Sequence, residues 1–167
     1  MEGKDKDFRQ EGNQLIYTRL LNAPRELVWE VWTQPQHLKE WWGPNGFTLT
    51  HKSMKVQKGS EWRFTMHGFG RNFENKITYL EVVRPSLLSY RHGDENESIN
   101  FMVYVTFDDA AGKTLLTMRS VFQSEEILAE LNRQVKAIEG GNQTLDKLEA
   151  YIKTQLQFKN QDHGQQN

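Results

Sequence analysis

The chain of 167 residues contains no cysteine, which excludes a disulfide framework and catalysis by a thiol. It also lacks any apolar run near the roughly 18 residues that a membrane-spanning helix needs. The polar N-terminal segment MEGKDKDFRQEGN has no apolar stretch of the kind found in secretory signals. These absences predict a cytoplasmic protein that does not insert into membranes.

An excess of charge of one sign is also lacking, since 21 lysines and arginines stand against 22 aspartates and glutamates. This balance gives no overall attraction for nucleic acid, so we expect no nucleic-acid partner. The five histidines show no spacing typical of metal sites, such as HExxH. The segment GFGRNF (68–73) lacks the third glycine and the following helix of a dinucleotide-binding loop. We therefore expect neither a metal nor a cofactor.

Aromatic bulk is what the chain does have. Aromatic residues make up 11% of the sequence, with five tryptophans and nine phenylalanines, although hydrophobic residues make up only 37%. The length fits one folding unit. We expect a single domain over 14–157, preceded by a flexible segment over 1–13 and followed by a flexible tail over 158–167.

Alternation and turn residues predict an α+β fold. A strand over 14–22 is followed by a helix that starts at Pro24 and by a second short helix over 35–41. Proline is favourable in the first turn of a helix and stops a helix that precedes it. The later strands alternate apolar and polar side chains and predict an antiparallel meander with one buried face, over 61–67, 73–83, 87–92, 99–107 and 114–122.

The C-terminal segment carries an apolar stripe at helical spacing, from the expected N-cap Ser124 to Leu156. Gly140 and Gly141 interrupt it, with Gly141 on the apolar face, although a helical glycine costs roughly 0.5–1 kcal/mol relative to alanine. Either one long helix passes through the glycines, or the chain breaks near 134–141 into two helices. In both cases the stripe must pack on the concave face of the sheet, and Gly141 is expected to leave a cavity there.

Four segments, in this order, resemble the family of activator of heat-shock-protein ATPase homologues: NAPRELVWEVWTQPQHLKEWWGPNGFT (22–48), KGSEWRFTMHG (58–68), ITYLEVVRPSLLSY (77–90) and EGGNQTLDKLEAYI (139–152). That family belongs to the START-like (SRPBCC) superfamily. The resemblance implies a helix-grip fold, in which a curved, seven-stranded antiparallel sheet wraps around a long C-terminal helix, with two short helices after the first strand. It also implies a hydrophobic cavity, whereas likeness of fold does not imply one activity.

The expected cavity has an apolar wall from the inner faces of the strands and the C-terminal helix, formed by Trp62, Phe64, Met66, Phe73, Phe101, Val103, Met118, Ile138, Gly141 and Leu145. Asn75, His92 and Ser120 are polar residues on the same inner faces. Because buried polar groups need partners, they either pair with one another or the backbone, or contact a ligand. Trp41 and Trp42 either divide between core and surface, or one of them covers the entrance of the cavity.

These features favour non-enzymatic binding of a hydrophobic or amphipathic small molecule or lipid, by a monomer or homodimer. Two alternatives remain open. One is a co-chaperone-like interaction module, with a chaperone ATPase as partner, an exposed patch and no open cavity. The other is a cyclase- or hydrolase-type enzyme, which needs His92 or Glu139 paired inside the cavity. Glu139 is expected to be exposed, and the sequence assigns no catalytic residue.

Overall fold

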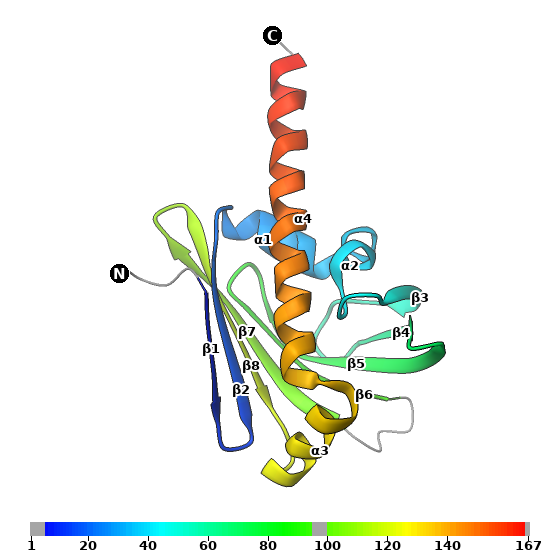
Figure 1. Ribbon diagram of the computed structural model, residues 1–167. Helices are drawn as coiled ribbons and strands as arrows, with labels where there is room; N and C mark the ends of the chain where they lie inside the picture. The colour runs from blue at the N-terminus through cyan, green and yellow to red at the C-terminus, as the bar shows by residue number, and fades with distance from the viewer. Residues whose placement is uncertain (1–5, 95–99, 166–167) are drawn as a thin grey trace.

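The structure, a computed structural model, describes residues 6–94 and 100–165 (Figure 1). The strands within these ranges are β1 (Lys6–Glu11), β2 (Gln14–Leu21), β3 (Thr48–Met54), β4 (Glu61–Gly68), β5 (Arg71–Val83), β6 (Leu87–Asp94), β7 (Asn100–Ala110) and β8 (Lys113–Val121). The helices are α1 (Arg25–Thr33), α2 (Pro35–Trp41), α3 (Glu125–Val135) and α4 (Ala137–Gln165).

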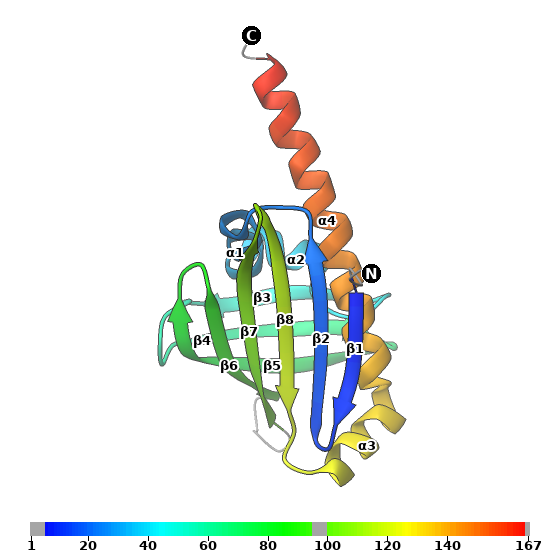
Figure 2. The ribbon, with the colours of Figure 1, turned by 90° about the vertical axis from the view of Figure 1, so that its left-hand side faces the viewer.

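The strands form one antiparallel sheet in the order β1-β2-β8-β7-β6-β5-β4-β3. Strands β3 to β8 are a meander, and the β1–β2 hairpin joins it because β2 pairs with β8. Figures 1 and 2 show the curved sheet with the N-terminal part of α4 lying across it and the C-terminal end of α4 extending past it. Helices α1 and α2 follow β2, and α2 contacts α4. The helix-grip architecture expected from the sequence is therefore confirmed.

Strand β1 lies inside the segment for which the sequence predicts flexibility, so the sheet has eight strands rather than seven. Five of its six residues are exposed, and only Phe8 is partly buried. The ring of Phe8 packs 4.9 Å from that of Tyr17 on β2. A strand at the edge of a sheet that buries one side chain has no apolar alternation, so the sequence pattern does not reveal it.

The C-terminal segment is broken into two helices, as the second of the two alternatives requires. The break falls at Lys136, whose φ of 52° is left-handed and ends α3. Gly140 and Gly141 therefore lie near the start of α4 rather than in the middle of one helix. Ser124 caps α3 as expected, since its hydroxyl accepts the Ile127 N–H. Helix α4 continues to Gln165, through residues where the sequence predicts a tail.

Two residues of β2 attach α4 to the sheet. The hydroxyl of Tyr17 donates to the carbonyl of Ile138 at 3.1 Å. Arg19, whose side chain is only 1% exposed, reaches the carboxylates of Asp146 at 2.9 Å and Glu149 at 3.1 Å. Because a charge buried to this extent needs paired groups, these ion pairs fix where α4 lies along β2.

A second attachment joins α4 to the loop after α2. The side chain of Gln143 accepts the Asn45 N–H at 3.0 Å, and the ammonium group of Lys147 donates to the carbonyl of Pro44 at 3.3 Å. Further along α4, Leu145 and Leu148 are fully buried in the core. The helix is therefore packed on the core between Leu145 and Ile152, and its first two turns border the cavity. None of the described helices is long and apolar enough to cross a membrane.

The two adjacent glycines of α4 are expected to respond in opposite ways to alanine. A Cβ at Gly141 would lie 2.6 Å from Cζ of Tyr17 and closer still to its hydroxyl, whereas a Cβ at Gly140 would meet the ring of Pro44 at 3.4 Å. Gly141→Ala should lower the free energy of unfolding by about 1–3 kcal/mol, because the buried Tyr17 must shift. Gly140→Ala should raise it by up to about 1 kcal/mol through helix propensity.

Urea denaturation of the two variants and the parent measures this difference. Gly140→Ala is the matched control, since it changes the same residue type one position away. Equal stability of the two variants would contradict the close packing of Tyr17 on Gly141.

Candidate ligand cavity

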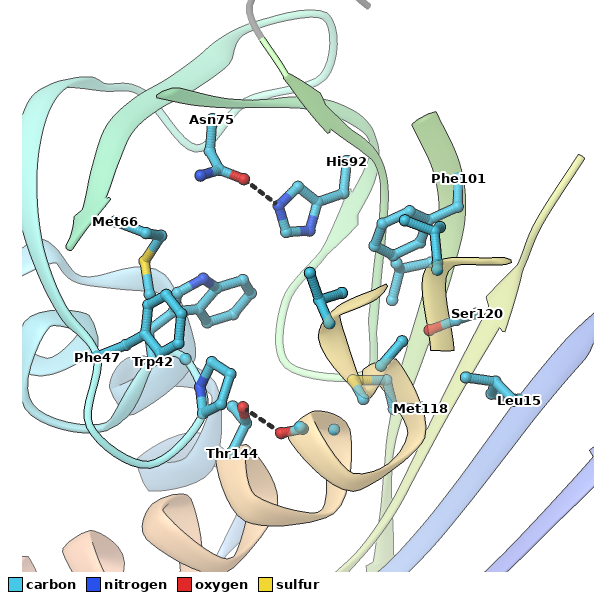
Figure 3. A pocket seen from close by; sticks show the side chains of 18 of the residues that line it. Leu15, Trp42, Phe47, Met66, Asn75, His92, Phe101, Met118, Ser120 and Thr144 are labelled. Atoms are coloured by element: carbon cyan, nitrogen blue, oxygen red, sulfur yellow. Dashed lines mark hydrogen bonds between the residues drawn. The ribbon is translucent and has the colours of Figure 1, made fainter. Parts of the chain in front are cut away.

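A cavity of about 420 Å³ lies between the first turns of α4, the loop after α2 and the concave face of the sheet (Figure 3). Its size falls within the range of sites that take small organic ligands. It exists because the fully buried side chains of α4 begin only at Leu145, while Ala137 and Gly140 border the cavity in the preceding turns. Small residues at the start of α4 thus leave volume between the helix and the sheet.

The structure brings most of the predicted wall to this cavity. The predicted residues that line it share the inner face of β4 to β8 or the adjoining helices, and they are Met66, Phe73, Asn75, His92, Phe101, Val103, Met118, Ser120, Gly141, Trp41 and Trp42. In the register, His92 lies opposite Phe101, and Val103 lies opposite Ser120. Their side chains therefore project to one side of the sheet from neighbouring strands. That they contact a ligand remains a prediction.

Four predicted wall residues are placed elsewhere. Trp62 and Phe64 stack on each other at 4.0 Å and are fully buried behind the wall. Leu145 is fully buried in the core beyond the end of the cavity. Ile138 packs against the core and contributes its carbonyl to Tyr17. Alternation identifies the inner face of a strand, but it does not separate residues that fill the core from residues that border empty volume.

The expectation that Gly141 keeps the cavity open is wrong. It borders the cavity, but the space where its side chain would be is occupied by the Tyr17 hydroxyl. The glycine therefore permits close approach of β2 and α4 rather than holding a void open. Gly140 faces the more open space, since only Pro44 lies near it.

The positions of the two adjacent tryptophans, Trp41 and Trp42, match neither of the two arrangements expected from the sequence. Trp41 is fully buried and donates its indole N–H to the carbonyl of Val31 at 3.1 Å. Trp42 is partly buried and forms an inner wall, with its ring 5.1 Å from Trp62 and 6.2 Å from His92 (Figure 3). Neither tryptophan is exposed at an entrance.

The exposed members of the described lining are Phe69 and Val135, at 68% and 38% exposure. Phe69 lies in the β4–β5 turn and Val135 ends α3. The cavity therefore opens between this turn and the α3–α4 junction. Phe69 packs its ring 5.0 Å from Phe47, so the apolar lining continues outward to the surface.

Other lining residues were missed from the sequence. They come from β2, the α2–β3 loop, β6 and the two C-terminal helices, and they include Leu15, Tyr17, Trp32, Pro44, Phe47, Tyr90, Asp94, Phe122, Leu131, Ala137 and Thr144. The alternation in β2 could have predicted Leu15 and Tyr17 as inner-face residues, and the apolar stripe of α3 could have predicted Leu131. The loop residues carry no periodicity, so no pattern in the sequence places them at the cavity.

Two of the three predicted inner-face polar residues satisfy each other. His92 Nε2 lies 3.0 Å from Oδ1 of Asn75, and the Asn75 amide nitrogen donates to the carbonyl of Phe73 at 3.0 Å (Figure 3). Aromatic rings surround the imidazole, with Phe101 at 5.0 Å and Phe64 at 6.1 Å. Burial among these rings lowers the pKa of His92 to about 4, because the charged form loses its hydration.

Ser120 differs from this pair. It is 6% exposed and lines the cavity, and within residues 6–94 and 100–165 no group hydrogen-bonds its hydroxyl. The hydroxyl is not among the inaccessible unpaired polar atoms of these residues, so it borders the space of the cavity, where a water or a ligand can satisfy it. Ser120 is therefore available to a molecule in the cavity.

The remaining candidate groups do not assemble into an acid–base pair within the described part of the chain. Glu139 is exposed, as expected, and accepts the side-chain amide of Gln143 at 3.1 Å. The hydrogen-bond partner of His92 is an amide rather than a carboxylate. Over the same residues, no cluster of three or more histidine and acidic side chains has the arrangement of a metal site.

An antiparallel sheet curved around a long C-terminal helix, with a cavity between them, defines a helix-grip protein of the START-like class. The model of the family described as Activator of Hsp90 ATPase homolog 1-like protein matches residues 22–153. The chain therefore belongs to that family, as the four segments of sequence predicted. No curated protein sequence matches the chain.

Solved structures share the fold at low sequence identity. A protein from Arthrobacter aurescens is 18% identical with a TM-score of 0.81, and the match covers 89% of this chain and 91% of that one. Protein Ms6760 from Mycobacterium smegmatis is 22% identical with a TM-score of 0.77, covering 86% and 94%. A protein from Staphylococcus epidermidis is 21% identical with a TM-score of 0.76, covering 89% and 94%. These likenesses show the fold alone.

The lowered pKa of His92 predicts a loss of stability in mild acid. In the unfolded chain His92 binds a proton when the pH falls below its ordinary pKa of 6.5. In the folded protein His92 binds the proton only when the pH approaches its lowered pKa of about 4. The part of the free energy of unfolding that comes from neutral His92 is therefore complete above about pH 6.5 and decreases as the pH falls toward 4. Between about pH 7.5 and 5 it should cost about 2 kcal/mol.

His92→Gln is the comparison variant, because an amide can still donate to Asn75 and does not titrate. Urea denaturation at both pH values should show the parent losing about 2 kcal/mol more than the variant. Parallel losses in the two proteins would mean that His92 is not desolvated in the fold.

Proposed function

We propose that this protein binds a hydrophobic or amphipathic small molecule in the cavity between the sheet and the first turns of α4. The supporting observation is the cavity itself, about 420 Å³ bordered mainly by aromatic and aliphatic side chains, with a few polar groups that include His92 and Ser120. Sites of this composition bind ligands by removing apolar area from water, while the few polar groups set the orientation. The opening beside Phe69 and Val135 provides a route for entry.

The geometry favours this function over the two alternatives. A co-chaperone-like interaction module would not need an open internal cavity, yet one is present. An enzyme of the cyclase or hydrolase type would need His92 or Glu139 paired with an ionisable group inside. His92 is instead paired with Asn75, and Glu139 is exposed. Binding without chemistry is therefore the function that these side chains support best.

Ser120→Leu tests the proposal by filling the cavity. Leucine would occupy part of the space and replace a hydroxyl that has no hydrogen-bond partner among the described residues, so the melting temperature should stay the same or rise. Binding of the neutral fluorescent probe N-phenyl-1-naphthylamine should weaken about tenfold or more. Titration of the probe against each protein, followed by its fluorescence, measures the dissociation constants.

Thr117→Leu is the matched control, since Thr117 lies on the same strand but on the opposite face from Ser120. It also replaces a hydroxyl-bearing side chain with an isobutyl group and should leave probe binding unchanged. If the parent does not bind the probe, or if Ser120→Leu binds it as well as the parent does, the cavity is not a binding site.

A further inference from the structure

The hydrogen bonds around Asn75 determine which nitrogen of His92 carries the proton. The carbonyl of Phe73 can only accept a hydrogen bond, so the Asn75 atom 3.0 Å from it must be the amide nitrogen. The amide oxygen of Asn75 then faces Nε2 of His92 at 3.0 Å. Because that oxygen can only accept, Nε2 must be protonated. In the neutral imidazole the other nitrogen, Nδ1, therefore has a free lone pair.

This lone pair belongs to a residue that lines the cavity. His92 projects into it beside Phe101 (Figure 3), and no described group donates a hydrogen bond to Nδ1. Desolvation lowers the pKa of His92 to about 4, which keeps the ring neutral under physiological conditions. The cavity thus presents a fixed hydrogen-bond acceptor on an otherwise apolar wall.

The charges of the lining point to the same kind of ligand. The described lining residues include no lysine and no arginine. Asp94, which follows His92 by two residues on the same face of β6, is the one acidic side chain among them. A carboxylate or phosphate in the cavity would lose its hydration without meeting a lysine or arginine of the described lining, which is strongly unfavourable.

We propose that the cavity selects uncharged ligands that carry a hydrogen-bond donor, such as a phenolic or alcoholic hydroxyl, which binds Nδ1 of His92. Asn75 is the positioning residue, since it fixes the tautomer that leaves Nδ1 as an acceptor. An acceptor-only ligand would place two lone pairs against each other at this point, and an anion would add an unpaired charge. This inference rests on the proposed function and specifies the ligand class of the same site.

Three naphthalene derivatives of similar size separate the two proposals. At about pH 7.5, 2-naphthol is a neutral donor, 2-methoxynaphthalene is a neutral acceptor, and 2-naphthoate is an anion. Calorimetric titration should give 2-naphthol an affinity about tenfold above that of the methyl ether and at least about a hundredfold above that of the carboxylate. Equal affinities would overturn the selection by His92 and leave hydrophobic binding intact. If none of the three binds, both proposals fail.

Two variants assign the selection to named residues. His92→Phe removes the acceptor and should make 2-naphthol and its methyl ether bind equally. Asn75→Leu removes the constraint on the tautomer, so the methyl ether should gain affinity relative to 2-naphthol. A tenfold preference that persists in both variants would overturn the role of His92.

Nitrogen NMR of the unliganded parent gives a test that does not depend on a variant folding. The chemical shifts of the His92 ring should show a protonated Nε2 and an unprotonated Nδ1, and in Asn75→Leu they should show a mixture of tautomers. A protonated Nδ1 in the parent would overturn the inference.

Discussion

The contact between Tyr17 and Gly141 sets the distance between α4 and the sheet, and the cavity depends on that distance. A tyrosine that donates to the Ile138 carbonyl can lie this close to a helix only where the helix has no side chain. Arg19 fixes the next turns through Asp146 on the same helix. Because β2 holds the start of α4 at a fixed distance from the sheet, the cavity lies between this part of the helix and the inner faces of β4 to β8.

The periodicity of the sequence accounts for the strands that carry the site. Alternation alone identifies inner-face residues such as His92 and Ser120. It can do so because side chains alternate between the two faces of a strand, and a shift of one residue would place them on the outer face. The edge strand β1 was missed because its side chains are mostly exposed, and the opening was missed because Phe69 lies in a turn. The sequence does not decide between one helix and two around Lys136, because lysine has no preference for the left-handed conformation that ends α3 there.

The case of Gly141 shows where sequence reasoning reaches its limit. A glycine on an apolar stripe shows that a side chain is missing, but it does not show what occupies the space. Here the occupant is Tyr17 from a strand more than a hundred residues earlier in the chain. The volume of the cavity comes instead from the neighbouring positions, where Ala137 and Gly140 border it with little or no side chain. Tertiary contacts of this kind have no local signature.

The pairing of His92 with Asn75 links the stability of the fold to the chemistry of the cavity. Aromatic rings around the imidazole disfavour its charged form, which lowers the stability of the fold in acid. A residue that only filled space would bring no benefit to offset this loss, because a phenylalanine would pack there and does not titrate. The amide of Asn75, itself oriented by the Phe73 carbonyl, satisfies one nitrogen and leaves the other facing the cavity. A buried polar group that is held in one orientation, and that keeps one lone pair free to accept a hydrogen bond, can orient a mostly apolar ligand.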